Sequence, residues 1–286
     1  MTPPKDTPTN DTTTADEARL AEIRRQRACM ATAPGGNLTL VNTQWITGEV
    51  GASQPIFGVP GLWSPLSGGM SGLHLTATAA DRIQIDGETV AGDVIVSGMD
   101  AAHPSRIRFS DAVTGTVIAN EDGEYALRVW DSRSEGVQNF GEIEAFPYDP
   151  AWVIEGTFTP HTGTGPVSIA NLSDEGKTRP MAVPGVISFT LGGEEHSLVA
   201  FDDGPRKLLV FADATTGDTS HSVGRYLRVV LGDERTVTLD FNLAYLPQCA
   251  FSYNFSCPIP PAGNRLALAV EAGERNVLNK NGDPLH

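Results

Sequence analysis

The sequence has few cysteines and no long apolar stretch. Three cysteines among 286 residues are too few, and odd in number, for the disulfide framework of a small secreted protein. The longest apolar runs, such as Leu208 to Ala212, fall far short of the roughly 20 residues that cross a bilayer. The N-terminus lacks the apolar stretch and the cleavage site of a secretory signal. We therefore expect a soluble, cytoplasmic protein.

Positive charge is also scarce. The chain holds 20 basic against 35 acidic residues, for a formal net charge of -15. An acidic chain repels phosphate backbones and anionic lipid head groups, and the longest basic run is the pair Arg24-Arg25. We expect neither a nucleic-acid nor a membrane partner, and the oligomeric state stays open.

One helix is expected near the N-terminus, before a long β-rich region. Thr14 and Glu17 have the spacing of a capping box, Leu20, Ile23 and Arg27 share a helical face, and Pro34-Gly35-Gly36 ends the run. From Leu38 onward, short apolar stretches alternate with Gly, Pro, Asn and Asp, which is typical of β structure. The predicted organisation is a disordered tail at 1–13, a helix at 14–37, a small β-sandwich at 38–135, a C-terminal β domain at 136–275 and a tail at 276–286.

Two hairpins are predicted from turn sequences. Asp86-Gly87 follows the apolar run Ile83 to Ile85, and Gly192-Gly193 separates Val186–Leu191 from His196–Phe201. Such dipeptides tolerate the positive φ that tight hairpin turns require. The expected fold class is mainly β, with an N-terminal helix followed by two β-sandwich or barrel-like domains.

The C-terminal third carries a specific series of motifs. They are Phe211 to Gly217, Gly224 to Leu227, Leu239 to Tyr245, Pro247 to Phe251 and Cys257 to Leu266. This series resembles an uncharacterised bacterial family catalogued as domain of unknown function 1684 (DUF1684), tightly from Leu208 to Glu274 and loosely from Leu38. The family pattern usually carries Arg where this chain has Leu243 and Tyr where it has His221. The resemblance implies no activity.

The N-terminal half resembles a forkhead-associated β-sandwich through Ile83 to Glu88 and the strands that follow. Phosphothreonine reading in such domains relies on a Gly-Arg pair and on a Ser followed by His. At the corresponding positions this chain has Gly48-Glu49-Val50-Gly51 and Gly69-Met70-Ser71-Gly72 instead. The resemblance therefore implies a degenerate domain that does not bind phosphopeptides.

The loop from Asp213 to Gly224 is rich in polar side chains. Asp213, Asp218 and His221 are residue types that bind divalent metals. The same residue types also form turns and satisfy loop amides without any ligand, and we favour that interpretation.

Arg225, Asp240 and Asn242 form a second candidate group. If their strands pair around Gly232-Asp233, Arg225 and Asp240 come within cross-strand reach and can form a charge-assisted ion pair. Such a pair would be either an architectural clamp, which we favour, or a site where Arg225 binds a carboxylate or phosphate and Asn242 orients it.

Cys249 and Cys257 could meet across seven intervening residues. Two thiols without a nearby His are too few for structural zinc, and no flanking Lys or Arg lowers their pKa, so we expect buried structural thiols.

The sequence predicts no reaction. It contains no Gly-x-Ser-x-Gly elbow, no His-Glu-x-x-His and no phosphate-binding loop, and we name no catalytic residue, metal or cofactor. The leading hypothesis is a binding module for a small polar or anionic ligand. Its expected site residues are Asp213, His221, Arg225, Asp240 and Asn242. The alternatives are a metal-dependent hydrolase that uses Asp213, Asp218 and His221, and a structural interaction protein that docks through Trp63, Trp130, Tyr148 and Trp152.

Overall fold

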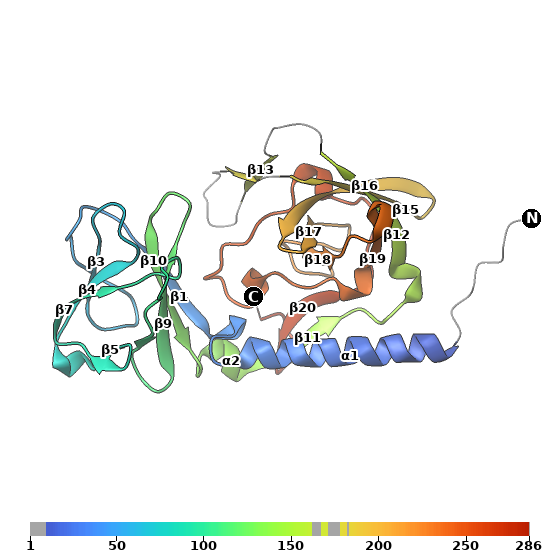
Figure 1. The fold of residues 1–286 in the computed structure, drawn as a ribbon. Helices are drawn as coiled ribbons and strands as arrows, with labels where there is room; N and C mark the ends of the chain where they lie inside the picture. The colour runs from blue at the N-terminus through green and yellow to red at the C-terminus, as the bar shows by residue number, and fades with distance from the viewer. Residues whose placement is uncertain (1–9, 162–166, 171–177, 182, 286) are drawn as a thin grey trace, which may run out of the picture. The chain divides into compact units, whose positions relative to one another are not determined.

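The structure, a computed structural model, describes every residue except 1–9, 162–166, 171–177, 182 and 286. The chain divides into two compact units, which are treated separately here: residues 1–29 and 140–286 form unit 1, and residues 30–139 form unit 2. One long N-terminal helix precedes a series of antiparallel sheets (Figure 1), so the predicted mainly β fold class is confirmed. Within the described residues, no helix is both long and apolar enough to span a membrane.

Unit 2 contains two antiparallel sheets. The six-stranded sheet has the order β1 (Leu40–Ile46), β10 (Tyr125–Asp131), β9 (Val113–Ala119), β8 (Ile107–Arg108), β5 (Gln84–Ile85) and β6 (Glu88–Thr89). The four-stranded sheet has the order β2 (Gln54–Pro55), β3 (Leu62–Pro65), β4 (Leu73–Ala77) and β7 (Gly92–Val96). The short helices are η1 (Asn37–Thr39), η2 (Ala79–Asp81) and α2 (Glu135–Asn139). Both sheets contribute to one apolar core, in which Trp63 and Leu127 are fully buried.

Unit 1 is built on a six-stranded sheet whose two edges approach each other. Its order is β18 (Arg225–Val229), β17 (Arg206–Phe211), β16 (Glu194–Asp203), β15 (Gly185–Leu191), β12 (Val153–Pro160) and β19 (Thr236–Asp240). A bridge between Leu231 and Val237 joins the chain just after β18 to β19, so the sheet curls toward a barrel. The two-stranded sheets pair β11 (Phe140–Ala145) with β20 (Glu274–Asn279) and β13 (Val167–Ala170) with β14 (Thr178–Met181). The single-turn helices are η3 (Pro150–Trp152), η4 (Asp233–Arg235), η5 (Phe241–Leu243), η6 (Gln248–Ala250) and η7 (Ala262–Asn264).

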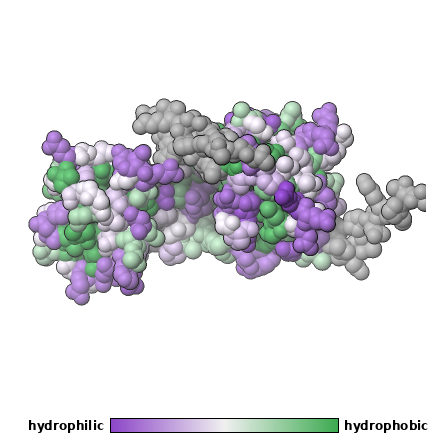
Figure 2. All heavy atoms as spheres, turned by 45° about the horizontal axis from the view of Figure 1, so that its top comes forward, coloured by the Kyte–Doolittle hydropathy of each residue, from purple (hydrophilic) through white to green (hydrophobic). Residues whose placement is uncertain are grey.

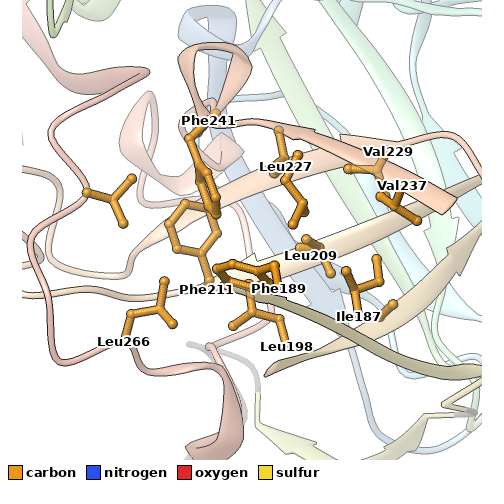
Figure 3. Close-up of a cluster of buried hydrophobic side chains, with 14 of the residues drawn as sticks. Ile187, Phe189, Leu198, Leu209, Phe211, Leu227, Val229, Val237, Phe241 and Leu266 are labelled. Carbon is orange, nitrogen blue, oxygen red and sulfur yellow. The ribbon is translucent and has the colours of Figure 1, made fainter. Parts of the chain in front are cut away.

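Aromatic rings fill the concave side of this curled sheet (Figure 3). The Phe241 ring meets the Phe211 ring edge-on, with 5.6 Å between the ring centres. The centre of the Phe189 ring lies 6.0 Å from that of Phe241. Val270 and Ala272, which follow the last single-turn helix, are fully buried in the same cluster. The segment before β20 therefore completes the core of unit 1.

Both predicted hairpins are confirmed. Ile85 pairs with Glu88 across Asp86 (φ 55) and Gly87 (φ 96). Leu191 pairs with Glu194 across Gly192 (φ 63) and Gly193 (φ 84). The positive φ angles show that the local turn chemistry sets the registers of these strands.

The predicted ends of the chain need correction. Helix α1 spans Asn10–Thr32, so it begins inside the stretch that we expected as a tail and ends earlier than predicted; residues 1–9 lie outside the described residues. The expected tail at 276–286 is wrong in its first part, because those residues continue β20, where Val277 is 4% exposed. The predicted boundary between residues 135 and 136 precedes by four residues the division between 139 and 140.

Large hydrophobic side chains reach the surface singly. Figure 2 shows hydrophobic residues interspersed among hydrophilic ones on the face in view. The most exposed are Phe57 at 82% and Tyr253 at 75%. Scattered exposed apolar residues of this kind are ordinary for a protein surface.

Candidate functional site

The predicted residue Arg225 lies inside unit 1, where it forms a buried ion pair with Asp213. Arg225 Nη2 donates to Asp213 Oδ2 at 2.7 Å and to the Val270 carbonyl at 2.7 Å, and Nη1 donates to the Ala272 carbonyl. Both side chains are fully shielded from solvent. Burial lowers the pKa of Arg225, while the Asp213 carboxylate opposes that shift. The guanidinium thus holds the core-completing segment, rather than a ligand, against the sheet.

Both oxygens of the Asp213 carboxylate accept hydrogen bonds from protein groups. Its Oδ1 accepts the Thr215 amide at 2.8 Å, the Thr215 hydroxyl at 2.7 Å and the Val270 amide at 3.2 Å. A buried ion pair is tolerated when further hydrogen bonds compensate for the lost water. Four donors do so for Asp213, although Arg225 Nε has no hydrogen-bond partner among the described residues. Of the two interpretations of a buried arginine pair, the geometry fits the architectural clamp.

The expected pair between Arg225 and Asp240 does not form. In the sheet, Arg225 lies on the edge strand β18, opposite Phe211 of β17. Asp240 lies on the other edge strand, β19, opposite Val153 of β12. Beyond the bridge at Leu231, the chain continues into β19, which pairs with β12. Strands β18 and β19 therefore do not form a hairpin. Asp240 Oδ1 instead accepts the amide and the side-chain nitrogen of Asn242, each at 3.0 Å.

Asn242 and His221 also have structural contacts of their own. Asn242 accepts the Asp149 amide at 3.0 Å and donates to the Asp149 carbonyl at 2.9 Å, which fixes the start of η3 beside η5. The His221 amide donates to the Arg275 carbonyl at 2.8 Å, and its Nε2 lies 3.9 Å from Cys249 Sγ. The five predicted site residues therefore occupy three separate places.

The residues proposed for the metal-dependent hydrolase do not assemble either. Asp213 is committed to Arg225, Asp218 is exposed, and within the described ranges no three His, Cys, Asp or Glu side chains could hold a metal ion. Of the residues proposed for docking, Trp63 is fully buried and cannot contact a partner, whereas the Trp152 ring is half-buried and packs edge-on against Phe241 at 6.3 Å.

A pocket that the sequence did not predict lies beside α1 in unit 1. Its volume is about 220 Å³. Helix α1 supplies one wall, and the other wall comes from the first residue of β17, from β18, from the turn after β19 and from the first residue of β20. The lining residues are Leu20, Ile23, Arg24, Arg27, Arg206, Arg228, Asn242, Leu243, Ala244, Tyr245 and Glu274. We call this the arginine pocket.

Two of its four arginines have carboxylate partners. Arg27 forms a two-pronged ion pair with Glu274, whose carboxylate also accepts the Leu246 amide at 2.8 Å. Arg228 Nε lies 2.5 Å from Asp203 in a solvent-exposed pair. Arg24 donates to the Phe146 carbonyl at 3.0 Å, and among the described residues neither Arg24 nor Arg206 has an ion-pair partner.

Tyr245 lies between two guanidinium groups in this pocket. The Arg27 and Arg228 guanidinium carbons each lie 5.0 Å from the centre of its ring. Burial raises the pKa of the Tyr245 phenol to about 12, although both arginines act in the opposite direction. The hydroxyl therefore keeps its proton at neutral pH and can donate a hydrogen bond.

Two buried polar atoms at the arginine pocket lack a partner within the part of the chain that the structure describes. They are Arg24 Nε and the Tyr245 hydroxyl oxygen. Leaving a buried donor unpaired costs about 1–3 kcal/mol. Both atoms belong to residues that line the arginine pocket.

One partial signal for this pocket is present in the sequence. Leu20, Ile23 and Arg27 share a helical face, and Arg24 lies on it as well, so the helix presents two apolar and two basic residues together. The remaining lining residues come from positions 206 to 274, and no local pattern connects them to the helix.

The comparisons with known proteins name no activity. Residues 138–275 match the family model described as "Protein of unknown function (DUF1684)". A solution NMR structure of an uncharacterized protein from Haloarcula marismortui is 40% identical; the match covers 48% of this chain and 77% of that one, with a TM-score of 0.40. No curated protein matches the chain. The similarity to a forkhead-associated domain in unit 2 stays a prediction.

Proposed function

We propose that this chain, which belongs to the DUF1684 family through residues 138–275, is a binding module for a small organic anion. The ligand would occupy the arginine pocket. The observation that carries this proposal is the pair of buried, unpartnered donors, Arg24 Nε and the Tyr245 hydroxyl, among four guanidinium groups.

The charge of the pocket favours an anion. Four arginines against Glu274 leave its lining with a formal charge of three positive units, whereas the whole chain carries -15. Clustered guanidinium groups repel one another, and a bound carboxylate or phosphate removes that repulsion. Arginine also binds such groups through charge-assisted hydrogen bonds, which are stronger than neutral ones.

The size and walls of the pocket favour a small ligand with an apolar part. A volume of about 220 Å³ equals the space of about seven water molecules in the liquid. Leu20, Ile23, Leu243 and Ala244 give the pocket an apolar side. A short-chain carboxylate fits both halves, with its oxygens toward Arg24 and Tyr245 and its hydrocarbon against the leucines.

The proposal keeps the class of ligand expected from the sequence and changes the site. Of the five residues first predicted, Asn242 alone lines the arginine pocket. Cytoplasmic location and bacterial origin remain predictions from the sequence.

A thermal-shift series on the full chain tests the proposal. The probes are inorganic phosphate, malonate and hexanoate, each at constant ionic strength with chloride as the reference. A ligand at 100 times its Kd stabilises the folded state by about 2.7 kcal/mol, so binding raises the Tm. We expect hexanoate or malonate to raise the Tm, and Arg24→Gln to remove most of that rise.

The matched control is Arg25→Gln on the same helix. Arg25 is exposed and pairs with Glu22 at the surface, so its loss changes the overall charge equally without touching the pocket. An equal loss of the ligand-induced Tm rise in both variants would mean that the anions act through general charge. No Tm rise with any of the three probes would count against the proposal.

A further inference from the structure

The thiols of Cys249 and Cys257 form a second cluster of reactive groups, apart from the arginine pocket. Cys249 lies in η6, and Cys257 lies on the far side of a short loop. The Cys249 amide donates to Cys257 Sγ at 3.2 Å, and the two thiols share a hydrogen bond. Both cysteines are free, and each is 4% exposed.

Two further side chains contact this pair. His221 Nε2 lies 3.9 Å from Cys249 Sγ. The Tyr226 hydroxyl donates to the Pro258 carbonyl at 3.2 Å and lies within hydrogen-bonding reach of Cys257. Two thiols with one imidazole fall short of the four ligands of structural zinc. Within the described residues, no three His, Cys, Asp or Glu side chains are arranged so that they could hold a metal ion together.

The surroundings distinguish the two sulfur atoms. Hydrogen bonds from the Cys249 thiol and amide and from Tyr226 lower the pKa of Cys257, although burial acts against this shift. The shared hydrogen bond and burial raise the pKa of Cys249. The thiolate is the reactive form of cysteine. Because the Cys249 amide donates directly to Cys257 Sγ at 3.2 Å, Cys257 is the sulfur better placed to carry the negative charge, with Cys249 as its protonated neighbour.

The pair lies close beneath the surface. Gln248, which precedes the first cysteine, and Ser256, which precedes the second, are both exposed. The neighbouring Tyr253 is 75% exposed. Exposed residues therefore flank both buried cysteines along the chain, so a small oxidant is better suited than a protein partner to reach their sulfurs.

We propose that Cys257 and Cys249 form a peroxide-reactive pair in which Cys257 is oxidised first and Cys249 closes a disulfide. The Cys257 thiolate attacks one peroxide oxygen; the O–O bond breaks, and the leaving hydroxide takes a proton to form water. Cys257 is then a sulfenic acid. Cys249 sulfur attacks the Cys257 sulfur, and the thiol proton leaves with the departing hydroxyl as a second water. Each turnover oxidises two thiols by two electrons and reduces one peroxide.

Mass spectrometry of the full chain in a Cys29→Ser background tests this order. Cys29 is exposed and would otherwise react independently. With hydrogen peroxide we expect a mass loss of two hydrogen atoms, a linked Cys249–Cys257 peptide and reversal by dithiothreitol. With dimedone as the trap, Cys257 in the Cys249→Ser variant should form sulfenic acid at least about tenfold faster than Cys249 in the Cys257→Ser variant.

The converse results overturn the proposal. They are equal trapping rates in the two single-thiol variants, or no reaction of either thiol under conditions that oxidise Cys29 in the wild-type chain. Cys249→Ala and Cys257→Ala provide a second pair of variants if a serine hydroxyl disturbs the buried site. The circular dichroism spectrum of each variant is recorded first. Reactivity is compared only among variants whose spectra match, so that a misfolded chain is not counted as an unreactive one.

Discussion

Removing the Asp213 carboxylate should destabilise unit 1 far more than removing a surface carboxylate. In Asp213→Ala, the Arg225 guanidinium stays fully buried without its counter-charge, and the Thr215 amide, the Thr215 hydroxyl and the Val270 amide lose an acceptor. Breaking one side of a buried pair costs about 3–5 kcal/mol. We expect a loss at the upper end of this range, because three further hydrogen bonds end on the other oxygen of the same carboxylate, Oδ1.

Urea unfolding followed by tryptophan fluorescence and calorimetry measures this loss. The two units can unfold separately, so the transition of unit 1 is fitted on its own. The control is Asp203→Asn, which removes the carboxylate from the exposed Arg228 pair on the same sheet. An exposed pair of this kind contributes about 0.2–1 kcal/mol.

The double variant Asp213→Ala with Arg225→Met separates charge from shape. It removes both buried charges, so its loss of stability should be smaller than the sum of the two single losses. A loss below about 1 kcal/mol for Asp213→Ala, equal to that of the control, would refute the clamp.

Three further predictions concern other groups. Burial raises the pKa of Tyr245 from 10.0 to about 12, so the folded state holds this proton more tightly than the unfolded chain. The resulting stabilisation is complete below pH 10 and is lost as the pH rises through 12. The pH dependence of stability in this range should be absent in Tyr245→Phe. Asn264→Ala leaves the Val199 amide and carbonyl and the Val210 carbonyl without this partner, and calorimetry should show a loss of about 3 kcal/mol. Chelation with EDTA should leave the Tm unchanged, because Asp213 is held by Arg225; a drop would show a metal ion in the fold.

The parts of the fold that depend on neighbouring residues could be predicted from the sequence. Asp86-Gly87 and Gly192-Gly193 set two hairpins because positive φ at these positions determines the turn and the register. The mainly β character followed from the spacing of apolar runs. The end of β20 was missed, since its strand is short and only Val277 in it is strongly apolar and buried.

The candidate site depended on strand order, which the sequence did not determine. Arg225 and Asp240 precede and follow the same turn, and this closeness predicted a hairpin. In the structure, β19 pairs with β12, whose residues lie 79 to 87 positions earlier in the chain, and Arg225 forms its ion pair with Asp213 instead. The arginine pocket was missed for the same reason: Arg24 and Tyr245 are brought together only by packing of the helix on unit 1.

A crystal structure of the full chain grown with selenate, an anion that scatters anomalously, tests the arginine pocket most directly. The account predicts an anomalous peak in the pocket, with selenate oxygens about 3 Å from Arg24 Nε and the Tyr245 hydroxyl. An empty or water-filled pocket at saturating selenate, with both donors bonded to protein groups, would contradict it.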